Sequence, residues 1–95
     1  MYLHLGKNTV VKKSDIIGIF DIENSTIAKS TKKFLAIAQK EKRIKNVSME
    51  LPKSFVVCME DNVEMVYISQ ISPTTLLKRA DGFEYGLVYQ KREGA

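Results

Sequence analysis

One cysteine, one histidine and no tryptophan occur among the 95 residues, and each scarcity removes a class of chemistry. Cys58 has no second cysteine with which to form an internal disulfide, which is typical of a protein from a reducing compartment. Because His4 is the sole histidine, multi-histidine metal sites and histidine-activated nucleophiles are excluded. The five glycines form neither a GxGxxG nor a GxxxxGK phosphate loop. We therefore expect a non-enzymatic protein with no cofactor, no metal and no small-molecule substrate.

Long apolar runs are also missing. No stretch approaches the roughly 18 apolar residues that a membrane helix needs, so we expect no membrane partner. The segment Met1–Gly6 has no basic lead and no long apolar stretch, so we expect no secretory signal. The residues are 44% hydrophobic and 27% charged, as in an ordinary globular domain. Together these features predict a small cytoplasmic protein.

The positive charge is concentrated in one segment. The whole chain has a net charge of +4, but Lys29–Lys45 alone holds seven basic residues and one acid, a local net of +6. The other 78 residues hold eight basic and ten acidic groups, a net of −2. Such a cluster is typical of a protein that binds a polyanion, and it is equally typical of a solvated helix face. Lysines outnumber arginines twelve to three, which favours contacts to phosphates over contacts to base edges.

Apolar patterning predicts short strands and then a helix in the first half of the chain. A hairpin is expected from residues 2–5 and 9–11 around a turn at 6–8, followed by a strand at Ile16–Ile22. A helix is expected from about Thr26 to Arg43, with cap residues just before it. At about 100° per residue, its core face gathers Ile27, Thr31, Phe34 and Ala38. The opposite face gathers Lys29, Lys32, Lys33, Lys40 and Arg43.

The second half predicts further strands and a short helix. A short extended stretch at 47–49 precedes Pro52, and the strongest strand follows at 54–59. Residues 63–69 are expected to return antiparallel after a turn, and Ser72 is expected to cap a helix that begins at Pro73. Residues 83–95 are either an edge strand or a partner-docking tail. The predicted fold class is α+β, with one mostly antiparallel sheet, a long amphipathic helix and a short second helix.

Few other residues suggest chemistry. Cys58 lies in the middle of the strongest predicted strand and is expected to be buried and inert. Acidic residues at 60, 61 and 64 could ligate a hard cation, but a solvated turn is the simpler interpretation. The loop at 49–54 is either a plain turn with an edge proline or part of a binding surface. The candidate DNA-binding residues are Lys29, Lys32, Lys33, Lys40, Arg43 and Lys53.

Four segments together resemble the RemA/RemB family of bacterial extracellular-matrix (biofilm) regulators. They are Tyr2–Gly6, Asp15–Asp21, Pro52–Val57 and Ile71–Ala80, and the details are closer to the RemB branch. We accordingly assign residues 1–82 to a RemA/RemB-like domain and 83–95 to a C-terminal extension. The resemblance implies a cytoplasmic α+β domain that assembles into rings. It also implies that RemA-type members bind DNA and activate matrix operons.

The residues that the family uses for DNA are replaced in this chain. The resemblance implies an arginine pair in the loop before the long strand and one arginine before an early strand. Here the loop positions hold Leu51 and Pro52, with only Lys53 nearby, and the early position holds Asp15. Leucine and proline side chains cannot donate the paired hydrogen bonds with which arginine holds a phosphate. DNA binding would therefore depend on Lys53 and on the basic helix.

Two functions follow from the sequence. The first is a non-enzymatic regulator of matrix gene expression that binds DNA as a homo-oligomer, with a ring as the implied arrangement. The second is a self-assembling protein-interaction module that regulates through partners without contacting DNA. The +6 segment favours the first function, and the missing arginines favour the second.

Overall fold

The computed structural model describes residues 1–22, 29–80 and the strand at 88–90, and it confirms an α+β fold with mostly antiparallel strands. Within these residues lie two helices and seven strands. The strands and helices, with a 3₁₀ turn at Lys13–Asp15, are β1 (Tyr2–Gly6), β2 (Thr9–Lys12), β3 (Ile16–Asp21), α1 (Lys29–Lys40), β4 (Ile44–Asn46), β5 (Ser54–Glu60), β6 (Val63–Ser69), α2 (Pro73–Ala80) and β7 (Val88–Gln90).

The strands form two sheets, and the prediction of a single sheet was wrong. β1 and β2 pair only with each other, while the other five strands form a second sheet in the order β4-β6-β5-β3-β7. In that sheet β5 is antiparallel to both β3 and β6, and the edge strands β4 and β7 run parallel to their neighbours. The β1–β2 hairpin buries Leu3, Leu5 and Val11 in a core shared with β5, so it forms a covering layer and does not extend the large sheet.

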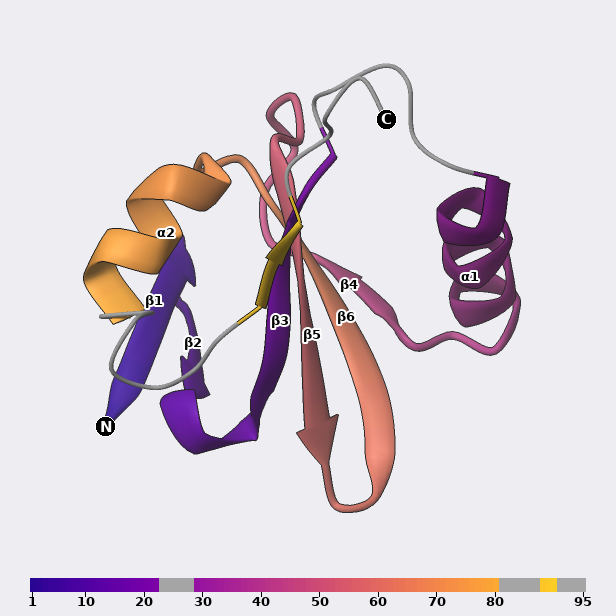
Figure 1. Cartoon of the computed structure of the whole chain (residues 1–95), viewed down its shortest axis with the longest axis horizontal. Coiled ribbons are helices and arrows are strands. Elements are labelled where there is room, and N and C mark those ends of the chain that lie inside the picture. Colours follow the sequence, from indigo (N-terminus) through magenta and orange to yellow (C-terminus); the bar gives the residue numbers. More distant parts are fainter. Residues whose placement is uncertain (23–28, 81–87, 91–95) are drawn as a thin grey trace.

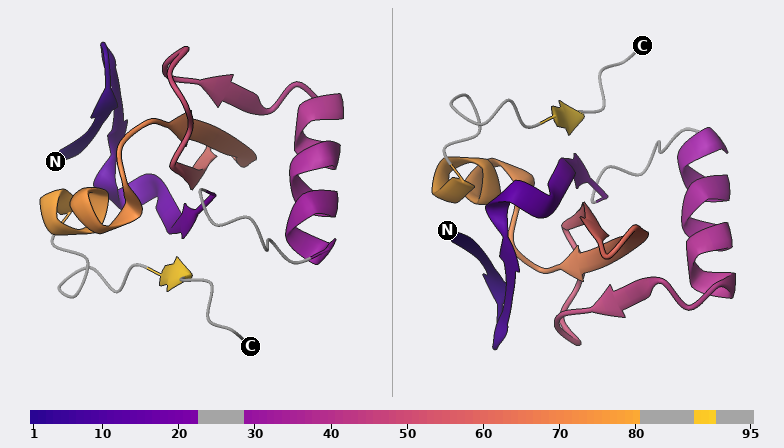
Figure 2. Two further views of the ribbon diagram at one scale, coloured as in Figure 1. Left: turned by 90° about the horizontal axis from the view of Figure 1, so that it is seen from above. Right: turned by 90° about the horizontal axis from the view of Figure 1, so that it is seen from below.

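The five-stranded sheet lies between the β1–β2 hairpin and α2 on one side and α1 on the other (Figures 1 and 2). It separates two hydrophobic clusters. On one face the hairpin and α2 cover Ile19, Val56 and Cys58, all of which are fully buried. On the other face α1 covers Phe55, Val57 and Val66 with its own Ala38. Successive strand residues point to opposite faces, so the apolar run in β5 supplies both clusters.

Two buried serines tie the layers together. Ser54 and Ser69 are paired across β5 and β6 and are both fully buried. The hydroxyl of Ser69 donates to the carbonyl of Leu5 at 2.7 Å, and the hydroxyl of Ser54 donates to the carbonyl of Ile71 at 2.8 Å. Each buried hydroxyl is therefore satisfied, and the two bonds hold β1 and the segment before α2 against the large sheet.

Helix α1 ends three residues earlier than predicted. Lys42 adopts a left-handed backbone (φ 60°), and the N–H of Arg43 donates to the carbonyl of Ala38 at 2.8 Å. The N–H of Lys42 donates to the carbonyl of Gln39 at 3.0 Å, which completes a Schellman cap. Glycine usually occupies the left-handed position, so the lysine gave no sequence signal for this stop. The predicted start at 26–28 lies outside the described residues.

The β5–β6 hairpin and α2 agree with the predictions. Asp61 and Asn62 both have positive φ, as a two-residue turn between twisted strands requires. The hydroxyl of Ser72 accepts from the N–H of Thr75 at 3.2 Å and thereby caps α2. The short strand was misplaced, because β4 occupies 44–46 and not 47–49. Its partner β6 lies about twenty residues away, and local patterning carries no information on such a pairing.

The C-terminal extension contributes an edge strand at residues 88–90, parallel to β3. This agrees with one of its two predicted forms. The rest of that extension lies outside the described residues, and the boundary at residue 82 stays a prediction.

Candidate nucleic-acid interface

Four of the predicted DNA-binding residues share the outer face of α1. We call Lys29, Lys32, Lys33 and Lys40 the basic face. At about 100° per residue, Lys29, Lys33 and Lys40 fall within about 40° of one another, with Lys32 beside them. All four are exposed, whereas Ala38 on the opposite side of the helix is fully buried. The packing of the helix against the sheet therefore directs these ammonium groups to solvent.

The charges of the basic face contribute little to the stability of α1, because their favourable and unfavourable effects are both small. None of the basic-face lysines forms an ion pair with any other residue in 1–22 or 29–80. Lys29 and Lys33 are four residues apart, and like charges at this spacing cost a few tenths of a kcal/mol. Lys40 lies in the last turn, where the macrodipole favours a cation, and the described part of the helix, 29–40, contains no acid. The pattern is therefore not explained by helix stability.

Arg43 is not part of this face, because it follows the Schellman cap. Its Nε donates to Oε1 of Glu41 at 2.7 Å, and one Nη donates to the backbone carbonyl of Glu64 at 2.8 Å. The same Nη lies 3.5 Å from the Glu64 carboxylate, and only 18% of the side chain is exposed. Its charge is thus balanced by two acids, and the side chain fastens the end of α1 to β6.

Lys53 lies on a different element from the basic face. Its N–H donates to the carbonyl of Ser69 at 2.9 Å, and its carbonyl accepts from the N–H of Ile22 at 3.1 Å. The residue is half-buried beside the start of β5. The structure therefore anchors the Lys53 backbone in the sheet but does not place it on α1 with the other lysines.

The loop before Lys53, which the sequence left as either a plain turn or part of a binding surface, exposes apolar side chains. Met49 is 101% exposed and Leu51 is 76% exposed, while Pro52 between Leu51 and Lys53 is also exposed. The local sequence Met-Glu-Leu-Pro indicates this exposure, because a proline favours a loop, and no neighbouring strand covers apolar residues in a loop. Exposed apolar groups of this kind mark contact surfaces.

The other chemically reactive groups are buried or occupied. Cys58 is fully buried as predicted, and burial, assisted by Glu60 and Asp15, raises the pKa of its thiol to about 12. The hydroxyl of Tyr67 donates to Glu60 at 2.6 Å, and burial followed by this hydrogen bond raises the pKa of Tyr67. The ring of His4 donates from Nε2 to the carbonyl of Lys7 at 2.7 Å, within the hairpin turn. These groups support the fold.

Among the residues that the structure describes, no three His, Cys, Asp or Glu side chains gather in a position to hold a metal ion. Neither α1 nor α2 is long and apolar enough to cross a membrane.

Comparison with known proteins agrees with the resemblance seen in the sequence. The family model RemA-like, described as extracellular matrix regulatory protein A-like, matches residues 2–80. Extracellular matrix regulatory protein B of Bacillus subtilis (strain 168) is 41% identical over 80 residues, which span 84% of this chain and 90% of that protein. The matched region includes both helices and six of the seven described strands. The chain therefore belongs to the RemA-like family, on its RemB branch.

Proposed function

We propose that the chain is a non-enzymatic regulator of extracellular-matrix gene expression, and that it binds DNA as a homo-oligomer through the basic face of α1. The relative named as an extracellular matrix regulatory protein supports the regulatory role. The basic face supports the choice of DNA, because four exposed lysines without described acidic partners lie on one side of one helix.

The basic face carries this proposal because its four exposed charges have no acidic partner among the described residues. Phosphates would relieve the repulsion between neighbouring lysines, and each neutralised phosphate would release a condensed counterion. Lysines hold the phosphates of the DNA backbone and are less specific readers of base edges than arginines, so the binding should depend weakly on sequence. In an oligomer the basic face would repeat and sum into a continuous positive surface.

The alternative is a self-assembling interaction module that acts through protein partners. Its support is the loop at 49–52, where exposed apolar side chains replace the arginines implied by the family resemblance. Such a loop could bury apolar area against a protein, whereas it offers no side-chain donor to a phosphate except the flanking Lys53. The two functions differ in whether the chain binds DNA at low salt.

The test is fluorescence anisotropy with labelled duplexes of promoter and random sequence over a range of salt concentrations. The variant Lys32→Gln/Lys33→Gln/Lys40→Gln should bind both duplexes more weakly by a similar factor. The magnitude of the slope of log affinity against log salt concentration should also fall by about two to three, since each phosphate contact contributes nearly one to that slope.

The matched control is Lys7→Gln/Lys12→Gln/Lys78→Gln, which removes the same charge from exposed positions outside α1. The control should lose far less affinity than the α1 variant. Equal losses in the two triple variants would mean that only net charge matters, and the basic face would then have no special role. An absence of binding by the parent at low salt would favour the interaction module.

A further inference from the structure

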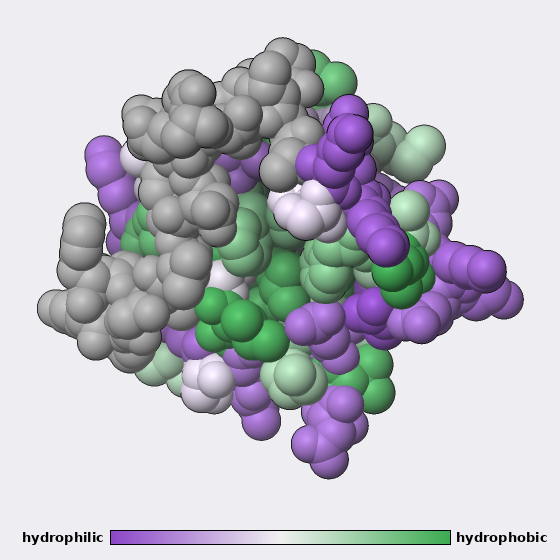
Figure 3. Space-filling model, turned by 45° about the vertical axis from the view of Figure 1, so that its right-hand side comes forward, coloured by the Kyte–Doolittle hydropathy of each residue, from purple (hydrophilic) through white to green (hydrophobic). Residues whose placement is uncertain are grey.

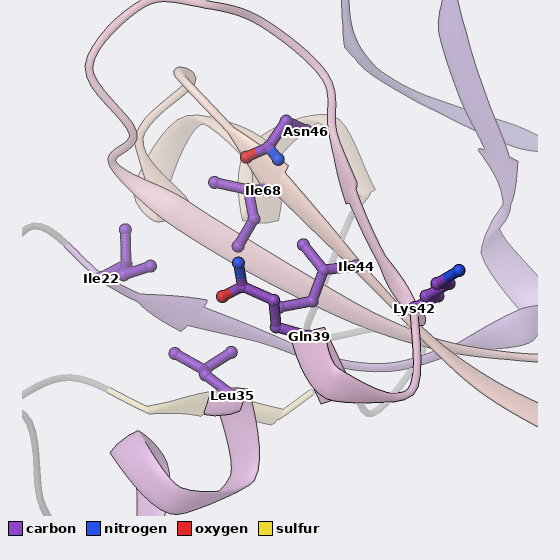
Figure 4. A pocket seen from close by; sticks show the side chains of 7 residues that line it. All are labelled: Ile22, Leu35, Gln39, Lys42, Ile44, Asn46 and Ile68. Atoms are coloured by element: carbon purple, nitrogen blue, oxygen red, sulfur yellow. The ribbon is translucent and has the colours of Figure 1, made fainter. Parts of the chain in front are cut away.

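An open groove lies between the inner side of α1 and the β4 end of the large sheet (Figure 4). It has a volume of about 530 Å³, within the range of small-molecule sites in proteins. Four aliphatic side chains, from α1, β4, β6 and the residue that follows β3, form most of its wall, and each of them is only half-buried. They are Ile22, Leu35, Ile44 and Ile68.

The groove exists because α1 covers only part of the sheet. Phe34, Leu35 and Ala38 meet the α1-side cluster, and the Schellman cap then turns the chain away towards β4. Leu35 and Ile44 therefore face each other across space that no described side chain fills. Figure 3 shows apolar residues gathered in a recessed centre on this side of the molecule, with hydrophilic residues to their right.

The polar residues of the groove restrict what could occupy it. Gln39 and Asn46 line it with side-chain amides that bond to no other described side chain or backbone group. Lys42 stands at the rim, and no acidic residue is among the lining residues. In Figure 4 the ends of Gln39, Leu35 and Ile68 point into a common opening, while Lys42 points away from it. The long, flexible stem of a lysine allows its ammonium to reach an anion at the rim.

We propose that this groove binds a small amphipathic carboxylate, with its hydrocarbon part against Leu35, Ile44 and Ile68 and its carboxylate at Lys42. Gln39 and Asn46 add uncharged amide groups to the wall of the groove. Burying the hydrocarbon also removes the exposed aliphatic surface of the groove from water. Such a molecule would be a bound ligand and not a substrate. The site is separate from the basic face, which lies on the outer side of the same helix.

The test is isothermal titration calorimetry of the purified full-length chain with sodium decanoate below its micelle concentration. We expect saturable binding of one decanoate per chain. Decanol, which lacks the charge, should bind at least tenfold more weakly, and inorganic phosphate, which lacks the hydrocarbon, should not bind. Equal binding of decanol and decanoate would overturn the anionic site, and unsaturable uptake would show only partition into an apolar surface.

Variants locate the site. Leu35→Trp should fill the groove and abolish decanoate binding, while Lys42→Gln should weaken decanoate at least tenfold and leave decanol unchanged. The control Lys78→Gln removes an exposed charge on α2, across the sheet, and should bind decanoate like the parent. Thermal melts check that each variant is folded. If Leu35→Trp does not fold, Lys42→Gln still tests the site. If Leu35→Trp instead lowers the mass of the protein in solution, a second copy occupies the groove and the proposal fails.

Discussion

At the scale of single residues, burial determines which groups are available for chemistry. Cys58 could be assigned as buried from the sequence, because it lies within the apolar run that becomes β5. The hydrogen bonds of Arg43 could not be predicted, because Glu64 lies 21 residues later and on another element. A charge pattern shows how many cations a segment carries, but partners distant in sequence decide which of them remain free.

Burial of Cys58 leads to a prediction for stability at high pH. An unfolded thiol ionises near pH 8.5, whereas the folded protein keeps the proton until the pH approaches about 12. In this interval the folded state binds more protons than the unfolded state, so the free energy of unfolding must fall as the pH rises. Below about pH 8 both states are protonated, and the thiol adds no pH dependence.

Urea denaturation at pH 8 and pH 10 measures this effect, with Cys58→Ala as the control. The parent should lose up to about 1.4 kcal/mol per pH unit more than the variant, which keeps Tyr67 and every other titrating group. If the two proteins lose the same stability, the thiol is accessible to solvent in the folded state.

At the scale of elements, local signals predicted those features that are encoded locally. The β5–β6 hairpin was placed correctly because its strands and turn are adjacent in sequence, and α2 because Ser72 and Pro73 mark its start. β4 and the end of α1 were misplaced. β4 depends on a parallel partner distant in sequence, and α1 ends at a left-handed lysine where a glycine would have been the signal. The groove was not predicted, since it depends on both of these features.

The junction between α1 and β4 gives a prediction for Arg43. Arg43→Gln should destabilise the fold by about 1–3 kcal/mol, because it removes charge-assisted hydrogen bonds from a side chain that is 18% exposed. Glu41→Gln should cost about 0–1 kcal/mol, because the Glu41 side chain is 58% exposed. Chemical denaturation of the two variants beside the parent measures both values.

The same variant separates the fastening role of Arg43 from a role in binding DNA. Under conditions where Arg43→Gln is fully folded, its affinity for DNA should stay close to that of the parent. An affinity loss with a flattened salt slope, like that expected for the basic face, would instead make Arg43 a phosphate contact.

At the scale of the whole molecule, the β1–β2 hairpin and the loop before β5 both expose large apolar side chains. Tyr2 and Val10 are 61% and 52% exposed on the outer side of the β1–β2 hairpin, and Met49 and Leu51 protrude from the loop before β5. Exposed apolar side chains do not stabilise a monomer, whereas contact with further copies of the chain would bury them. The sequence alone indicated apolar segments near the termini. It could not show which of their side chains face outward, because that depends on the hairpin forming a layer of its own.

These surfaces predict that the chain forms a homo-oligomer at micromolar concentration. Light scattering should give a mass of several chains, and Leu51→Glu should lower that mass, because a carboxylate would then be buried in the contact without a partner. Leu51 is 76% exposed in the single chain, so the substitution should leave the thermal melt of the individual fold unchanged. Thr74→Glu adds the same charge at an exposed position on α2 and should leave the mass unaltered. A parent mass equal to one chain would contradict the prediction. Each protein molecule would then have to bind DNA with a single basic face.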